Sequence, residues 1–151
     1  MTTLQRQELA SSPGHPLDRT IRIWGNPDFQ TLAQRSAQRF RAGHPQDTVA
    51  LHMTGSDTGM GGLYTGEADV ALLGRPATDS ELQAFEWVFR HPPTCTEIAA
   101  DGSDNQAKTP RGRSLYVYLD SGQGAQPLAP VFLHDILSQS GRSGHSCAST
   151  R

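Results

Sequence analysis

Apolar and β-branched residues recur in short runs along the middle of the chain, and turn residues follow most of them. The runs are "TIRIW" at 20–24, "TVALHM" at 48–53, "ADVALLG" at 68–74, "CTEIAA" at 95–100 and "SLYVYLD" at 114–120. Runs of this kind, bounded by Gly, Pro, Asn or Asp, predict strands. The third run is nearly all apolar, which predicts a strand that is buried on both faces of a sheet.

Between the first and second strands, and between the second and third, apolar residues recur at helical spacing, which predicts a helix in each interval. A first helix is predicted to end at Gly43, and a short second helix to start near Gly59. The predicted buried face of the first helix is Phe29, Leu32, Ala33, Ala37 and Phe40.

Two further helices follow. "TDSE" at 78–81 predicts a capping box, in which Thr78 and Glu81 exchange hydrogen bonds at the start of a third helix. "HPP" at 91–93 is predicted to end that helix, because proline cannot donate the backbone hydrogen bond that continuation requires. The last helix is predicted within 122–139. The predicted buried residues are Leu82, Phe85, Val88 and Phe89 in the third helix, and Leu128, Phe132 and Ile136 in the last.

Alternation of strands and helices predicts an α/β fold with three layers, a mainly parallel sheet flanked by helices on both faces. A chain of 151 residues fits a single domain. We predict one folded unit at 19–140, with disordered tails at 1–18 and 141–151.

Charge and composition exclude several functions. The formal net charge is -2, and the basic residues cluster only in the short "RGR" at 111–113, so no nucleic-acid partner is expected. No apolar run is long enough to span a bilayer, and no signal peptide is visible at the start of the chain. Cys95 and Cys147 are predicted to be unpaired, since one lies near a strand and the other in a polar tail.

Known catalytic and metal motifs are missing from the sequence. The six histidines show no pair at metal-ligand spacing, so neither a metal nor a cofactor is expected. The glycine-rich stretch "TGSDTGMGGLYTG" at 54–66 lacks the Gly-Lys-Ser/Thr ending of a phosphate-binding P-loop. Because we identify no nucleophile with a base, the chain is not expected to be an enzyme.

Three loops follow the first three strands and should share one rim of the sheet, where ligands of α/β proteins bind. The loop at 54–59 offers hydroxyl groups and a helix N-terminus, which together favour an oxyanion. The alternative is that Ser56 or Asp57 only caps the helix and that the glycines allow close packing. Arg75, at the same rim, could bind an anion or could form a surface ion pair with Asp79 or Glu81.

The combination of "TIRIWGNPDF", "GSDTGMGGLYTGEADVALLGR" and the closing segment "RSLYVYLDSGQGAQPLAPVFLHDILSQSGR" resembles the first lobe of the substrate-binding proteins of phosphate ABC transporters. These form the phosphate-binding branch of the type 2 periplasmic-binding fold. The resemblance implies binding of phosphate or a similar oxyanion, an ABC transporter permease as partner, no insertion into the membrane, and a periplasmic or extracellular location. The ligand-binding residues that it implies are Gly25, Asn26, Ser56, Asp57, Thr58, Gly59, Gly74 and Arg75.

The chain departs from that family in two places. The second lobe of the family is missing, and the junction at 101–113 stands where it would be inserted. Gly74 and Arg75 stand where the best-known phosphate binders place a carboxylate. The resemblance therefore implies a truncated, weak solute-binding protein. The alternative is a non-transport interaction module, or a gene remnant that retains a stable lobe without ligand.

Overall fold

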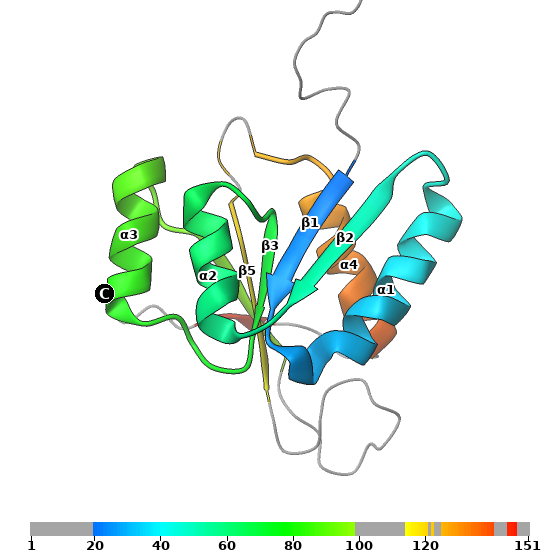
Figure 1. The fold of residues 1–151 in the computed structure, drawn as a ribbon, viewed down its shortest axis with the longest axis horizontal. Helices are drawn as coiled ribbons and strands as arrows, with labels where there is room; N and C mark the ends of the chain where they lie inside the picture. Colours follow the sequence, from blue (N-terminus) through cyan, green and yellow to red (C-terminus); the bar gives the residue numbers. More distant parts are fainter. Residues whose placement is uncertain (1–19, 99–113, 121, 123–124, 141–144, 148–151) are drawn as a thin grey trace, which may run out of the picture.

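The computed structural model describes residues 20–98, 114–120, 122, 125–140 and 145–147. The strands are β1 (Thr20–Gly25), β2 (Thr48–Met53), β3 (Val70–Leu73), β4 (Thr94–Ile98), β5 (Leu115–Leu119) and β6 (His145–Ser146) (Figure 1). The helices are α1 (Gln30–Gly43), α2 (Ser56–Thr65), α3 (Asp79–Phe89) and α4 (Ala129–Ser140), with a 3-10 turn η3 (Pro27–Phe29) before α1.

The strands form one mixed sheet in the order β2-β1-β3-β5-β4-β6. Pairing is parallel from β2 to β1 and from β1 to β3, but antiparallel from β3 to β5, β5 to β4 and β4 to β6. The three-layer α/β prediction is confirmed, whereas the mainly parallel pairing is corrected. Strands β1 to β4 do share one direction, but β5 lies between β3 and β4 and runs against both, and antiparallel neighbours need no crossover helix between them.

Two apolar cores lie on opposite faces of the sheet. Helices α1 and α4 cover one face, where Ile21 and Ile23 of β1 pack with Phe40 and Phe132 (Figure 1). Helices α2 and α3 cover the other, around the buried Phe85. Strand β3 contributes Val70 and Leu72 to the first core and Ala71 and Leu73 to the second, so its predicted burial on both faces is confirmed.

Helix ends agree with the sequence in part. The capping box of Thr78 and Glu81 is confirmed at the start of α3. Helix α2 begins at Ser56, three residues before the predicted start near Gly59. In α3 the prediction for Val88 is wrong: its side chain is 51% exposed, because α3 is an outer helix that buries only a narrow stripe.

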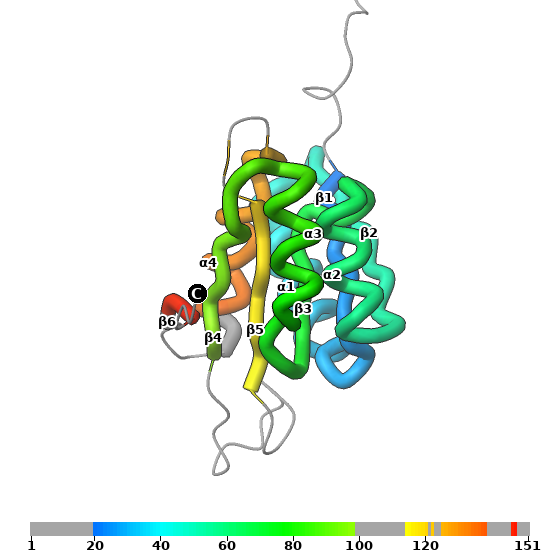
Figure 2. Tube along the Cα trace, turned by 90° about the vertical axis from the view of Figure 1, so that its left-hand side faces the viewer, coloured from blue at the N-terminus to red at the C-terminus, as the bar shows by residue number. Residues whose placement is uncertain are grey.

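Cys95 and Cys147 form a disulfide, so the prediction that they are unpaired is wrong. Their Cα atoms lie 5.3 Å apart because β6 pairs with β4 at the edge of the sheet (Figure 2). The Cys147 N–H also donates to the Cys95 carbonyl (3.0 Å). Residues 145–147 are thus part of the fold and not of a tail, a correction that sequence spacing could not reveal.

Other predictions fall outside the described residues: the N-terminal tail at 1–18, the junction at 101–113 and the remainder of the C-terminal tail. Within the part of the chain that the structure describes, no helix has both the length and the apolar character needed to cross a membrane.

Candidate anion-binding site at the sheet rim

The three predicted loops meet at one rim of the sheet. Parallel pairing of β1 with β2 and β3 places their carboxyl ends side by side. Backbone hydrogen bonds then connect the loops: the Asn26 N–H donates to the Leu72 carbonyl (2.9 Å), and the Gly55 N–H donates to the Gly25 carbonyl (2.8 Å). The residues named from sequence are therefore brought together, and we call them the rim site: Gly25, Asn26, Ser56, Asp57, Thr58, Gly59, Gly74 and Arg75.

The Ser56 hydroxyl is the centre of this rim. Its oxygen accepts hydrogen bonds from Nδ2 of Asn26 (3.1 Å) and from the backbone N–H of Gly74 (3.0 Å). One side chain at the first turn of α2 thereby holds the loops after β1 and β3. A hydroxyl has two acceptor positions and one proton, so the proton of Ser56 remains to be donated.

The glycines of α2 allow the helix to lie directly on the sheet. A Cβ atom added at Gly59 would lie 3.1 Å from the Cα of Gly25 and 3.1 Å from the carbonyl oxygen of Trp24. A Cβ at Gly25 would in turn overlap the backbone of Leu72. Gly25 and Gly59 are buried and serve close packing, the alternative that the sequence left open.

Some donors at the start of α2 are already used within the chain. The Thr58 N–H donates to the Asp57 carboxylate (2.8 Å), and the Gly59 N–H donates to the Gly55 carbonyl (3.0 Å). None of the described residues accepts a hydrogen bond from the N–H groups of Ser56 and Asp57 or from the hydroxyl protons of Ser56 and Thr58. These four donors are the part of the rim site that remains available to an acceptor.

Arg75 forms an ion pair with Glu81, one of the two alternatives considered from sequence. Its Nη1 and Nη2 donate to the two carboxylate oxygens at 2.9 and 3.0 Å, and Nη1 also donates to the Pro76 carbonyl. The hydrogen bond to Glu81 raises the pKa of Arg75 above its usual value. Arg75 is thus a cation that is paired with the carboxylate of Glu81.

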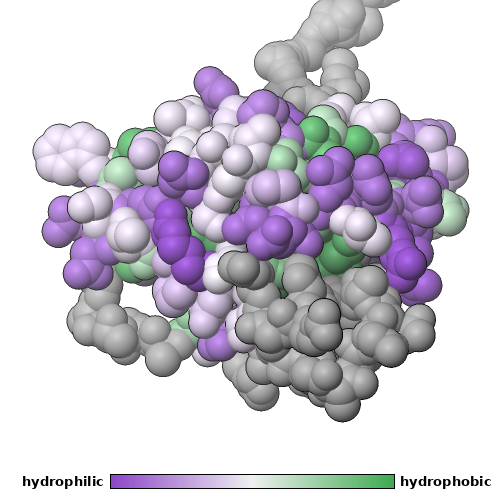
Figure 3. Space-filling view, turned by 60° about the horizontal axis from the view of Figure 1, so that its bottom comes forward, coloured by the Kyte–Doolittle hydropathy of each residue, from purple (hydrophilic) through white to green (hydrophobic). Residues whose placement is uncertain are grey.

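The charges at the rim do not add up to a positive patch. Asp57 is exposed at the start of α2, and its carboxylate is close enough to act on Arg75. Among the described residues of the rim site and its partner Glu81, the two carboxylates of Asp57 and Glu81 outnumber the one cation, Arg75. Hydrophilic side chains cover much of the described surface on this side of the molecule (Figure 3). Anion binding here would rest on hydrogen-bond donors and the helix N-terminus more than on net charge.

Two residues near the rim were not named as ligand contacts from sequence. Glu81 was recognised only as a capping residue and an alternative ion-pair partner. Tyr118 accepts a hydrogen bond from the Ala77 N–H (2.9 Å) across 41 residues of sequence, a distance over which local patterns carry no signal. No group of His, Cys, Asp and Glu that could hold a metal ion occurs within the described ranges.

The fold and the rim define an α/β lobe of the kind found in binding proteins. Residues 10–103 match the family described as a PBP superfamily domain, and the chain belongs to this family. A curated relative, the phosphate-binding protein PstS of Pseudomonas aeruginosa, is 29% identical over 77 residues. That match covers 51% of this chain but only 24% of the relative, so the chain spans about a quarter of the length of the relative.

One solved structure is similar to this chain at the level of the fold. A full-length BenM mutant is 9% identical, with a TM-score of 0.56, over 91% of this chain and 72% of that chain. A possible phosphate binding protein from Planctomyces limnophilus is 21% identical, with a TM-score of 0.44, over 59% of this chain and 34% of that chain.

Proposed function

We propose that this chain is a solute-binding lobe of the phosphate-transporter type, with phosphate or a similar oxyanion bound at the rim site. The family membership supports a ligand-binding lobe, and the similarity to a phosphate-binding protein supports the choice of ligand. A permease of an ABC transporter would be the partner of such a lobe.

One observation carries the proposal. Both acceptor positions of the Ser56 hydroxyl are engaged by Asn26 and Gly74, so this group can interact with a ligand only as a donor. It stands beside the open N–H groups at the N-terminus of α2. These donors have no acceptor among the described residues, and they lie at the positive end of the helix dipole. They therefore suit a group that only accepts hydrogen bonds, such as an oxyanion.

We further propose that the site is truncated and weak. Residues 99–114 connect β4 to β5, and this connection is too short to fold as a second lobe. A single lobe leaves the bound anion open to water, where the higher effective dielectric weakens each charge-assisted hydrogen bond. The acidic Asp57 and Glu81 near the rim reduce the affinity for an anion further.

A second candidate is a lobe that keeps its fold without a ligand. The observation in its favour is that Ser56 and Arg75 both have structural partners inside the chain, since Ser56 joins two loops and Arg75 is balanced by Glu81. An interaction module or a gene remnant could retain the rim for stability alone.

The disulfide supports a location outside the cytoplasm. Disulfides form and persist in oxidising compartments and are rare in the cytosol. The cross-link between Cys95 and Cys147 therefore agrees with the periplasmic or extracellular location that the resemblance implies.

Thermal unfolding with added anions separates the two candidates. A ligand that binds the native state raises the free energy of unfolding by RT ln(1 + [L]/Kd), and the Tm rises with it. We expect millimolar phosphate to raise the Tm, with sodium chloride of equal ionic strength as the control. If phosphate, sulfate and a small carboxylate all leave the Tm unchanged, the second candidate, a lobe without a ligand, explains the structure better.

A further inference from the structure

We propose that Tyr118 is the positioning residue of the rim site, because its hydroxyl holds the loop from which the Gly74 N–H orients the Ser56 hydroxyl. This inference rests on the proposed function for its effect on binding, while its structural part can be measured without any ligand. The loop in question is residues 74–78, which joins β3 to α3, and we call it the rim loop.

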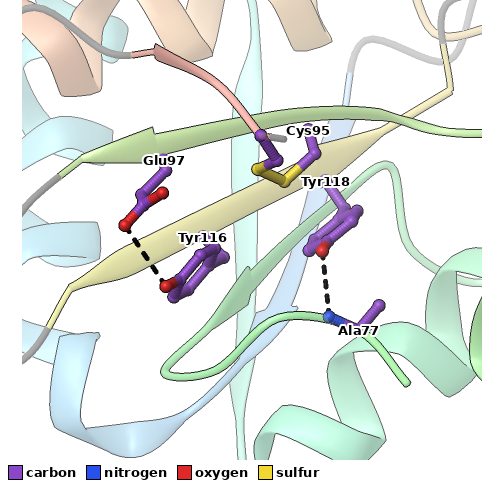
Figure 4. The surroundings of a disulfide bond; sticks show 6 residues. Ala77, Cys95, Glu97, Tyr116 and Tyr118 are labelled. Carbon is purple, nitrogen blue, oxygen red and sulfur yellow. Dashed lines mark hydrogen bonds between the residues drawn. A yellow bond between two sulfur atoms is a disulfide. The ribbon is translucent and has the colours of Figure 1, made fainter. Parts of the chain in front are cut away.

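Tyr118 reaches the rim loop from the neighbouring strand β5. Its side chain is 4% exposed, and its hydroxyl oxygen accepts the hydrogen bond from the Ala77 N–H at 2.9 Å (Figure 4). The rim loop contains no helix or strand, so side-chain contacts of this kind must fix its position. Burial raises the pKa of Tyr118, so its hydroxyl stays neutral at physiological pH.

The rim loop carries three contacts of the rim. The Gly74 N–H donates to the Ser56 hydroxyl, Arg75 pairs with Glu81, and Thr78 opens the capping box of α3. Ala77 lies between the last two, and the hydrogen bond that its N–H donates to the Tyr118 hydroxyl attaches this stretch of the loop to the sheet. A displacement of the loop would move the donor that orients Ser56, and hence the proton that Ser56 offers to the ligand.

Tyr118 is itself supported from the side. Cys95 of β4 is its register partner, and in an antiparallel pair such residues project from the same face. Figure 4 shows the disulfide of Cys95 next to the Tyr118 ring, while the hydroxyl of that ring extends to Ala77. The ring is therefore fixed between the second apolar core and a covalent cross-link, which suits it to hold a loop in place.

Tyr118→Phe tests the role, because it removes the hydroxyl and keeps the ring. The matched control is Tyr116→Phe, on the same strand and the same face of the sheet, whose hydroxyl donates to Glu97 where that of Tyr118 accepts from the rim loop (Figure 4). We expect Tyr118→Phe to weaken phosphate binding about fivefold by calorimetry, the change that loss of one hydrogen bond of about 1 kcal/mol produces. Tyr116→Phe should leave the affinity unchanged.

Amide hydrogen exchange provides the measurement that needs no ligand. In Tyr118→Phe, exchange at the Ala77 and Gly74 amides should be at least about tenfold faster than in the parent protein, and in Tyr116→Phe it should be unchanged. Equal exchange at both amides in the two variants would overturn the positioning role. If the parent protein binds no phosphate, the proposed function fails, and the exchange rates alone decide whether Tyr118 positions the loop.

Discussion

In the proposed function, Ser56 combines a structural role with a ligand contact. Its oxygen accepts hydrogen bonds from Asn26 and Gly74, and none of the described residues accepts its proton. The two roles do not compete, because the structural hydrogen bonds use the lone pairs of the hydroxyl oxygen and a ligand would use its proton.

Ser56→Ala is expected to abolish the rise in Tm that phosphate produces. The variant should also lose about 1–3 kcal/mol of unfolding free energy, because Asn26 and Gly74 are left without their acceptor. Thermal unfolding with and without phosphate measures both effects. Ser138→Ala, at an exposed position of α4, is the control and should retain the shift. A shift of undiminished size in Ser56→Ala would exclude this hydroxyl from binding.

Glu81 should make part of the stability depend on pH. Burial alone would raise the pKa of its carboxyl, but hydrogen bonds from Arg75 and Thr78 outweigh burial and hold the pKa below its ordinary value of 4.5. A carboxyl with a lowered folded-state pKa stabilises the fold above its unfolded pKa, and this contribution is lost as the pH falls through the folded pKa.

Glu81→Gln is therefore expected to cost about 1 kcal/mol at neutral pH. The difference from the parent protein should shrink as the pH falls from about 4.5 through the lower folded-state pKa, because the native Glu81 carboxylate loses its charge over that range. Urea unfolding at a series of pH values measures the difference. If it stays constant down to the lowest pH at which the protein is folded, the ionised carboxylate is not its source.

The position of α2 on the sheet depends on glycine at one face of the helix. Gly59 lies against the backbone of β1, whereas a Cβ added at Gly61 would meet nothing within 4 Å. The two glycines stand in the same helix but differ in what surrounds them, so they form a matched pair.

Gly59→Ala should destabilise the lobe by about 1–3 kcal/mol, since α2 must move away from β1. Gly61→Ala should be neutral or stabilising by up to about 1 kcal/mol, because alanine has the higher helix propensity. Urea unfolding of the two variants provides the comparison. Equal effects would show that propensity, and not close approach to the sheet, decides the cost at Gly59.

For the molecule as a whole, the disulfide links the last described residues to the edge of the sheet. It closes a loop with a sequence separation of 52 and fastens β6, a strand of two residues, to β4. A cross-link over a separation of this size stabilises a protein mainly by restricting its unfolded chain.

Cys147→Ser is expected to lower the unfolding free energy by about 2–4 kcal/mol. Treatment of the parent protein with dithiothreitol should produce a similar loss and should leave the variant unchanged, which separates the cross-link from the side-chain substitution. The measurement is urea unfolding under oxidising and reducing conditions. Equal stability of the parent protein in both conditions would contradict a stabilising role.

Local patterns in the chain were enough to predict the helices and strands and to identify the loops of the rim site. Short apolar runs, helical spacing and the "TDSE" motif each depend on residues a few positions apart, so β3 and the capping box at Thr78 followed from them directly. The position of Ser56, Asn26 and Gly74 at one rim also followed, because parallel strands bring their carboxyl ends together.

The spacing of residues along the chain could not predict contacts between distant segments. The insertion of β5 between β3 and β4, the disulfide of Cys95 with Cys147 and the hydrogen bond from Ala77 to Tyr118 join residues about 20 to 50 positions apart. Of the two partners considered for Arg75, the packing of the rim loop on α3 selects Glu81. Such contacts depend on how the layers pack, and packing depends on the whole set of buried side chains at once.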